Sequence, residues 1–233
     1  MLRLALDAGH GINTAGKRCH VKLDPKETRE NVLNRRVADK VCDRLNLYDC
    51  EVLRVDDVSG KNDVSLVSRV NKSNNFNADV FISIHHNAGL NCRNGGGITV
   101  YYSSSKAERK TQAENLYKCL IARTGLKGNR SNPVSKKGFY VIKHTTAKSF
   151  LIENGFMDSP QDVPIILSEA HADKTADAIV DFLVSSFGLT KKSSSETPSK
   201  PSEKDYEAIG RALEKCMNDL DDVDSFKELF DLL

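Results

Sequence analysis

The sequence predicts an α/β protein in which helices flank a mostly parallel β-sheet. Short apolar runs, typical of strands buried on both faces, recur along the chain. They alternate with longer amphipathic segments that favour helices, and this alternation generates a parallel sheet sandwiched between helices. A chain of 233 residues is long enough for one such domain with a small appendage.

The expected elements follow one another along residues 2–187. An apolar stripe predicts a helix from Glu30 to about Leu45. Residues 66–71 are expected to continue a helix whose start is signalled by the polar segment 59–63. The expected strands are 2–7, 51–55, 80–85, 98–102, 139–142 and 149–153, and two further helices are expected near 107–124 and 172–187.

The domain that these elements form is predicted to cover residues 1–189. Residues 190–204 are rich in Ser, Lys and Pro without apolar periodicity, which predicts a flexible linker. Residues 205–233 show two short amphipathic patterns typical of a helical tail. Because about thirty residues rarely stabilise a core alone, we expect this tail to oligomerise, dock on the main domain, serve in wall targeting or be a remnant of a larger module.

Charge divides along the same boundary. Residues 1–189 carry a net charge of +6, whereas residues 203–233, with ten acids and four bases, carry −6. A basic domain suits an anionic polymer such as a cell wall with acidic groups. We expect no nucleic-acid partner, since aromatic residues do not interleave with the basic ones as stacking would require. Solvated faces without a special role are the alternative explanation.

Neither a membrane span nor a disulfide framework is expected. No apolar stretch approaches the roughly 18 to 20 residues that cross a bilayer. The first residues lack the pattern of a secretory signal, so we expect the protein to stay in the cytoplasm of the cell that produces it until another route releases it. The six cysteines form no CxxC pair and are expected to be reduced, and the adjacent Cys19 and His20 are weak evidence for a metal site.

Three apolar runs end on residues able to bind a metal or work beside one. The first run ends at His10, the second at the tandem His85 and His86, and the third at Glu153. Ligands of open parallel sheets gather outside the carboxyl ends of the strands, so these residues are expected to face one cleft. Successive strand residues point to opposite faces, so only one of the two adjacent histidines is expected to bind the metal.

Glu30, at the start of the first predicted helix, completes the set. Two imidazoles and one carboxylate suit zinc with a fourth position open to water, and no HExxH motif is present. For His10 the alternative is an ordinary turn histidine, and for Glu30 a carboxylate that interacts with the helix dipole.

Glu153 can take a proton from water that zinc has acidified and deliver it to a leaving nitrogen. Its alternative is a salt-bridged carboxylate at a strand end. Because it follows the apolar residues 150–152, the catalytic interpretation is favoured.

Six segments together resemble the zinc-dependent N-acetylmuramoyl-L-alanine amidases of the amidase-3 family, most closely its phage endolysins and sporulation autolysins. They keep the family's order and approximate spacing from residue 2 to about 187. These segments are LDAGHG at 6–11, TRENVLNRRVADKV at 28–41, DVSLVSRVNKSN at 63–74, ADVFISIHHNAG at 78–89, GGGITVYY at 95–102 and FLIENGFMDSPQD at 150–162.

The resemblance implies a twisted six-stranded sheet and cleavage of the amide between muramic acid and the first L-alanine of peptidoglycan. Matched by position, it implies that zinc is held by His10, Glu30 and His85 and that Glu153 is the catalytic residue. The resemblance makes Glu27 a nearby decoy and not the ligand, and His86 occupies a position usually filled by a small residue.

Two further comparisons concern the rest of the chain. Residues 148–149 are Lys-Ser where many relatives have Pro-Ala. The segment between residues 102 and 139 is short, so the autoinhibitory helix of some periplasmic relatives is expected to be absent.

The expected function is therefore lysis of a bacterial wall by a peptidoglycan amidase, with a phage endolysin as the first interpretation and a sporulation autolysin as a close second. Two other classes remain open. One is a wall-binding protein that keeps the fold without catalysis, and the other is a zinc peptidase that acts on free peptides.

Overall fold

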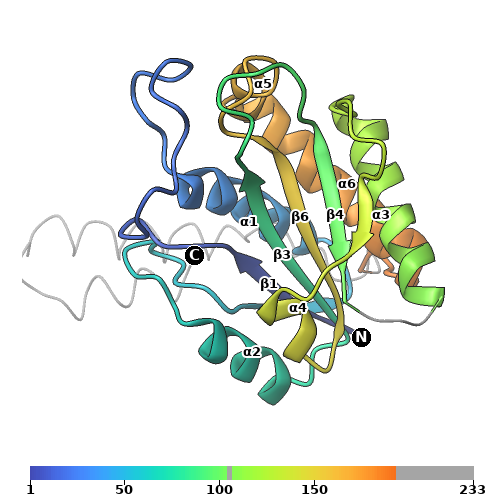
Figure 1. The fold of residues 1–233 in the computed structure, drawn as a ribbon. Coiled ribbons are helices and arrows are strands. Elements are labelled where there is room, and N and C mark those ends of the chain that lie inside the picture. Colours follow the sequence, from blue (N-terminus) through green and yellow to red (C-terminus); the bar gives the residue numbers. More distant parts are fainter. Residues whose placement is uncertain (104–106, 193–233) are drawn as a thin grey trace, which may run out of the picture. The chain divides into compact units, whose positions relative to one another are not determined.

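A computed structural model describes residues 1–103 and 107–192, whose strands form one six-stranded sheet (Figure 1). The sheet order is β2-β1-β3-β6-β4-β5. Strands β2, β1, β3 and β6 run parallel, whereas β4 is antiparallel to β6 and parallel to β5. The predicted α/β fold with a mostly parallel six-stranded sheet is thereby confirmed. The strands are β1 (Leu2–Ala8), β2 (Cys50–Arg54), β3 (Val80–Asn87), β4 (Ile98–Tyr102), β5 (Val134–Lys136) and β6 (Lys148–Phe156).

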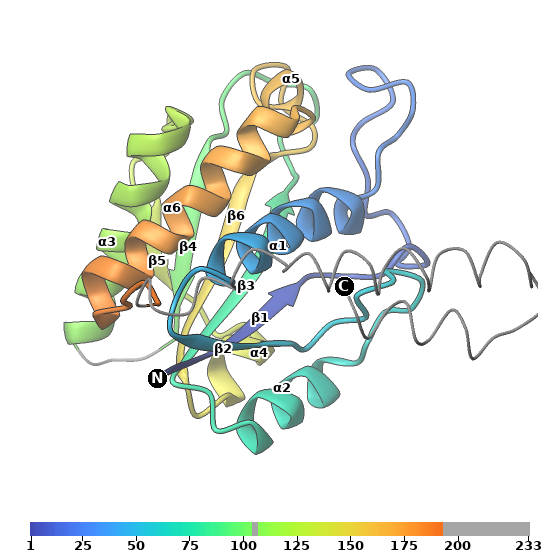
Figure 2. The ribbon, with the colours of Figure 1, turned by 180° about the vertical axis from the view of Figure 1, so that it is seen from behind.

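Three long helices cover one face of the sheet: α1 (Glu30–Leu45), α3 (Ala107–Thr124) and α6 (Glu169–Phe187) (Figure 2). The stripe predicted for α1 is buried there, together with Ile82 and Ile84 of β3. This larger core supplies most of the apolar burial that stabilises the domain. The short helix α5 (Val163–Ile166) connects β6 to α6.

The other face of the sheet is covered only in part. Helices α2 (Leu66–Asn75) and α4 (Tyr140–His144) pack on a smaller core that includes Ala5, Phe81 and Leu151. Because side chains alternate along a strand, the next residues of this face toward the carboxyl ends of β1, β3 and β6 are polar. They are Asp7, Ser83, His85 and Glu153. This polar end of the face is where the site is built.

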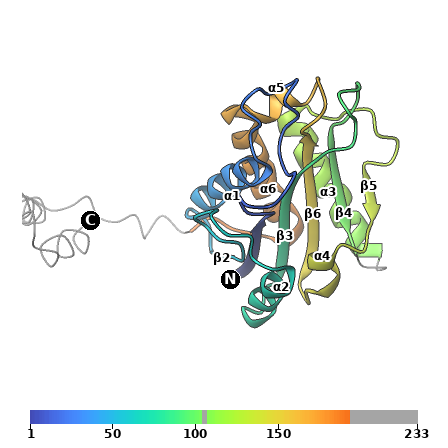
Figure 3. The same cartoon turned by 60° about the vertical axis from the view of Figure 1, so that its left-hand side comes forward.

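The predicted strand at 139–142 is wrong, because these residues belong to α4. The run Phe-Tyr-Val-Ile is short and apolar, so its periodicity does not distinguish a strand from a buried helical turn. Val141 and Ile142 are consecutive and both buried on the smaller core, which a helix allows and a strand does not. The edge strand is instead β5 (Figure 3), whose three mixed residues carry no strand pattern.

The predicted start of α2 near residues 59–63 also needs correction. The helix begins at Leu66, and the hydroxyl of Ser65 accepts the backbone N–H of Ser68 as its N-cap. Residues 57–62 form a turn instead, in which the carboxylate of Asp57 accepts backbone N–H groups of Ser59 and Asn62. A short side chain that satisfies nearby backbone donors favours a turn over a helix.

The compact unit of the described chain runs from Met1 to Lys191. The N–H of Asp49 donates to the carbonyl of Thr190, and Lys191 forms a β-bridge with Tyr48. The predicted linker thus begins with two residues held against the main domain, while its part from residue 193 and the predicted tail lie outside the described residues. In the described ranges, no helix has the length and apolar character required to cross a bilayer.

We expect a chain that ends at Lys191 to unfold in urea at the same midpoint as the full chain. As a matched control, a chain that ends at Gly188 loses the buried Leu189 and the bond to Thr190. Its free energy of unfolding should be lower by about 2–4 kcal/mol. Equal midpoints for both truncated chains would contradict this account of the boundary.

Candidate metal centre and active site

The carboxyl ends of β1, β3 and β6 lie side by side at one edge of the sheet. The N–H of Gly9, just after β1, donates to the carbonyl of Ile84 on β3 at 3.0 Å. On the other side of β3, His85 pairs in register with Glu153 of β6. The three residues that end the apolar runs are therefore brought to one place, as expected from the strand order.

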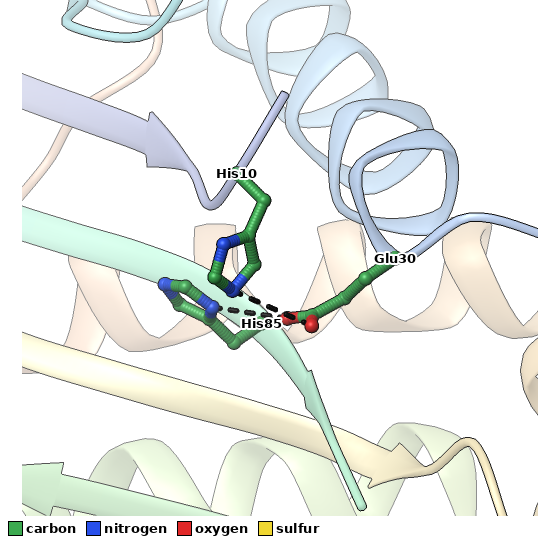
Figure 4. A group of neighbouring side chains, drawn as sticks. All are labelled: His10, Glu30 and His85. Carbon is green, nitrogen blue, oxygen red and sulfur yellow. Dashed lines mark hydrogen bonds and ion pairs between the residues drawn. The ribbon is translucent and has the colours of Figure 1, made fainter. Parts of the chain in front are cut away.

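Glu30 joins this edge from the first turn of α1. Its side chain is only 1% exposed, and its carboxylate faces the imidazoles of His10 and His85 (Figure 4). Oε1 is 3.0 Å from Nδ1 of His85 and accepts the backbone N–H of His86 at 3.2 Å. Oε2 is 3.4 Å from Nε2 of His10 and 3.7 Å from Nζ of Lys17. One carboxylate thus contacts β1, β3 and the loop before α1.

The protonation states around Glu30 follow from burial and charge. Burial by itself would raise the pKa of Glu30, but the hydrogen bond and charge of His85, with His10 and Lys17, lower it to about 2. Burial lowers the pKa of His10 to about 4, although Glu30 acts in the opposite direction. For His85, burial lowers the pKa but its bond to Glu30 and the nearby carboxylates raise it above the usual value. An anionic carboxylate that faces two imidazoles attracts a cation.

His10, Glu30 and His85 form a group that can hold a metal ion. Each offers one ligand atom, and the three atoms lie within 4.8 Å of one another. Oε2 of Glu30 is buried without a hydrogen-bond partner in the described structure, so it is free to bind a cation. Two nitrogens and one carboxylate oxygen are the donor set of a catalytic zinc site with an open position. The residues present therefore fit a metal.

Gly9 makes room for the ring of His85. An ideal Cβ at residue 9 would lie 2.0 Å from Cε1 of His85, so the position excludes every side chain. The chain then turns at His10, whose φ of 66° lies in the left-handed region that β-carbon residues rarely adopt. As a result, the rings of His10 and His85 contact each other edge to face, with their centroids 5.0 Å apart. Strain of this kind at a turn is common at functional sites.

His86 takes a different role, which the sequence left open. It is buried on the opposite face of β3, and its Nδ1 is 2.8 Å from Oδ1 of Asn34 on α1. Asn34 also donates to the carbonyl of Gly9 at 2.9 Å. His86 and Asn34 therefore hold the helix that carries Glu30 against the turn that carries His10. Asn34 lies four residues after Glu30, on the same side of α1, and that spacing was the only available signal.

Glu153 stands beside His85 but outside the metal-binding group. Its Oε2 is buried without a hydrogen-bond partner in the described structure. Burial, together with the charge of Glu30, raises its pKa to about 7, against the opposing influence of His85 and Lys17. A carboxyl group with a pKa near neutrality can both accept and release a proton, which is what general acid–base catalysis requires.

A pocket of about 420 Å³ opens next to His10 and His85. Its floor is stiffened by Arg69, a fully buried side chain that pairs with Asp7 and donates to the carbonyl of Ala8 at 2.9 Å. Arg69 also bonds Asp63 at 3.0 Å. The pocket is lined by Asp7, Gly9, His10, Thr14, Asp63, Val64, Ser65, Leu66, Arg69, His85 and Val141. It is polar at the strand ends and apolar toward α2 and α4.

The weaker sequence candidates lie away from this group. Glu27 is paired with Arg18 at 3.7 Å on the exposed loop before α1. Cys19 is buried, and burial raises the pKa of its thiol to about 12, so it is no ready metal ligand. Residues 148–149 start β6, five or four residues before Glu153 and so at the opposite end of the strand.

A sheet that gathers a His-Glu-His group and a carboxylic acid at its strand ends defines a framework for metal-assisted hydrolysis. Residues 4–185 match the family described as N-acetylmuramoyl-L-alanine amidase, and the chain belongs to this family.

Curated relatives and solved structures agree with this. The chain is 32% identical over 183 residues to the N-acetylmuramoyl-L-alanine amidase LytC of Bacillus subtilis, covering 77% of this chain and 34% of LytC. It is 30% identical over 182 residues to the probable cell wall amidase LytH of Staphylococcus epidermidis, covering 77% of this chain and 56% of LytH. The chain thus spans about a third to a little over half of these relatives.

Among solved structures, an N-acetylmuramoyl-L-alanine amidase from Clostridium difficile 630 superposes with a TM-score of 0.71 at 26% identity, covering 80% of this chain and 97% of that one. The catalytic domain of the amidase CwlV from Bacillus (Paenibacillus) polymyxa gives a TM-score of 0.71 at 25% identity, covering 81% and 99%. The described residues therefore match nearly the whole of both solved chains.

We expect Gly9→Ala to weaken zinc binding about 10- to 100-fold, because the new methyl group pushes the ring of His85 aside. Gly138→Ala is the matched control, since no atom lies within 4 Å of a Cβ built there. Zinc affinity is measured by competition with a chelating dye. Unchanged affinity in Gly9→Ala would show that His85 does not depend on this glycine.

Burial lowers the pKa of His171, at the start of α6, to about 4 from an ordinary value of 6.5. The unfolded chain therefore takes up a proton first, so the stability due to neutral His171 is present above pH 6.5 and is lost as the pH falls toward 4. Through this group, the free energy of unfolding should be about 2 kcal/mol lower at pH 5 than at pH 8.

Urea denaturation of metal-free protein at both pH values measures this loss. His171→Gln keeps a donor for the carbonyl of Asn154, which His171 Nε2 approaches at 3.3 Å, but cannot titrate. Its loss of stability should be smaller, whereas the exposed His144→Gln should behave as the unsubstituted protein. An equal loss in all three proteins would contradict the assignment.

Proposed function

We propose that the protein is a zinc-dependent N-acetylmuramoyl-L-alanine amidase that cleaves the amide between muramic acid and L-alanine in peptidoglycan. The observation that carries this proposal is the placement of Glu153 next to His85 of the His10–Glu30–His85 group. The family membership and the names of the relatives support the choice of substrate.

His10, Glu30 and His85 would hold the zinc ion. When bound, zinc supplies Lewis-acid chemistry, since it polarises a carbonyl and makes water acidic near neutral pH. Glu30 carries the negative charge that favours the cation, while the N–H of His86 keeps its Oε1 in place. The lack of a side chain at Gly9 leaves room for the ring of His85, and the bond from Asn34 to the carbonyl of Gly9 fixes the turn that leads to His10.

Glu153 acts as the proton carrier. With a pKa near 7, a substantial fraction is ionised at neutral pH and can accept the proton of the attacking water. The protonated acid then donates to the nitrogen of L-alanine as the carbon–nitrogen bond breaks. The products are the carboxylate of the lactyl group and a stem peptide with a new amino group, which also takes up the proton that the lactyl carboxyl group loses.

Mass spectrometry of purified peptidoglycan digested by the protein tests this proposal. Intact stem peptides with a free L-alanine amine should appear, disappear with a chelator and return when zinc is added. Cuts within the peptide would favour the zinc peptidase, and wall binding without a new amine would favour the non-catalytic wall-binding protein. Either result would overturn the proposal.

Glu153→Gln should lower turnover by at least about 100-fold with zinc content unchanged, because the amide cannot carry the proton. Elemental analysis of the purified variant gives its zinc content, and release of the free amine gives its rate. Wild-type turnover in Glu153→Gln would exclude Glu153 as the proton carrier. Loss of zinc would instead indicate that Glu153 helps to hold the metal.

The route to the wall belongs to the same proposal. We infer that the enzyme acts as a phage endolysin, made in the bacterial cytoplasm and released when the membrane is breached, with a sporulation autolysin as the second candidate. The net positive charge of residues 1–189 supports attraction to an anionic wall. Cell fractionation before and after membrane permeabilisation tests the route, and protein found outside intact cells would contradict it.

A further inference from the structure

Thr99 extends the row of site residues across a third strand. His85 on β3 pairs in register with Glu153 on β6, and Glu153 pairs in register with Thr99 on the antiparallel strand β4. Directly paired residues of neighbouring strands point to the same face, with their β-carbons about 5 Å apart. Glu153 therefore stands between His85 on one side and Thr99 on the other.

Both Thr99 and Glu153 carry a buried polar atom without a partner in the described structure. These atoms are Oγ1 of Thr99, whose residue is 2% exposed, and Oε2 of Glu153. A buried hydroxyl or carboxylate oxygen that is left unpaired destabilises the folded protein. A single hydrogen bond between these laterally paired side chains would satisfy both atoms, and the register places the two residues directly opposite each other on one face of the sheet.

We propose that Thr99 is a positioning residue whose hydroxyl bonds the carboxylate of Glu153 and holds it beside the metal-binding group. This inference rests on the proposed function of Glu153. A hydroxyl is one donor and two acceptor lone pairs, so it can donate to the ionised carboxylate and accept from the protonated acid. Thr99 thus keeps Glu153 in one orientation through both halves of a proton transfer.

A direct contact between Thr99 and the substrate is a weaker explanation of its unpaired hydroxyl. Its side chain is almost completely buried, so little of it is accessible to a substrate. On the side of β4 away from Glu153, strand β5 pairs with β4 only from Val100, opposite Val134. No residue of β5 is therefore paired with Thr99. Among the polar groups described here, Glu153 is the one that the strand register places beside it.

The test compares Thr99→Val, which keeps the shape and removes the hydroxyl, with Thr99→Ser, which keeps the hydroxyl. Both are measured in the full zinc-loaded chain with a soluble muropeptide. We expect Thr99→Val to lower kcat about 10- to 100-fold, as for loss of a hydrogen bond to a charged group, with KM and zinc content unchanged. Thr99→Ser should stay within about threefold of the unsubstituted protein.

Two results would overturn the inference while leaving the proposed function intact: an unchanged kcat in Thr99→Val, or a raised KM with unchanged kcat, which would indicate a substrate contact.

A double-mutant cycle on the unfolding midpoint tests the bond without using activity. Thr99→Val should lower the midpoint in the unsubstituted protein but not in Glu153→Ala, and equal shifts in both backgrounds would show that no bond joins the two residues. If the cycle shows that Thr99 and Glu153 are coupled but the protein has no amidase activity, only the proposed function is refuted.

Discussion

The structure of the site depends on one buried carboxylate, that of Glu30. A charge removed from water costs several kcal/mol unless it is paired and hydrogen-bonded. Glu30 finds its partners in His85, His10 and the backbone N–H of His86, which come from different segments of the chain. The folded domain therefore has to bring the ends of β1 and β3 to the start of α1, so forming the fold and assembling the metal-binding group are the same event.

The unequal cover of the two sheet faces explains where the cleft lies. Helices α1, α3 and α6 bury one face along its length, whereas α2 and α4 cover only the apolar part of the other. Beyond them the strands carry Asp7, His85 and Glu153. The Asp7–Arg69 pair is buried at this boundary and ties α2 to the end of β1. Such a pair contributes little net stability, but its geometry fixes the wall of the pocket next to the site.

Site residues that are marked by their immediate sequence neighbours could be predicted from the sequence. His10 follows a strand and His85 ends an apolar run, so strand-end geometry predicts that these two meet. Glu30 starts an amphipathic helix, and the family resemblance placed it with them. The structure brings these three together, while their role as zinc ligands stays a prediction. The roles of His86 and Asn34 were not predictable, because they depend on which helix packs on which face.

Other features depend on partners distant in the chain. The segment at 139–142 is helical because two adjacent side chains both pack on the smaller core, and β5 is a strand because β4 offers it an edge. Thr99 lies beside Glu153 only because β4 runs antiparallel to β6, which reverses the direction of the otherwise parallel sheet. Periodicity gives the face of a strand residue but neither the neighbouring strand nor the register.

The two glutamates of the site, Glu30 and Glu153, have the same side chain but very different pKa values. Glu30 and Glu153 are both buried, and burial raises the pKa of each. Glu30 has imidazoles and N–H groups around its oxygens and remains an anion with a pKa of about 2. Glu153 has fewer partners and feels the charge of Glu30, so its pKa rises to about 7. Environments that push two pKa values apart suit one carboxylate to hold a lasting charge and the other to the proton transfer that we propose for it. Here the difference in pKa comes from the number of hydrogen-bond donors around each carboxylate.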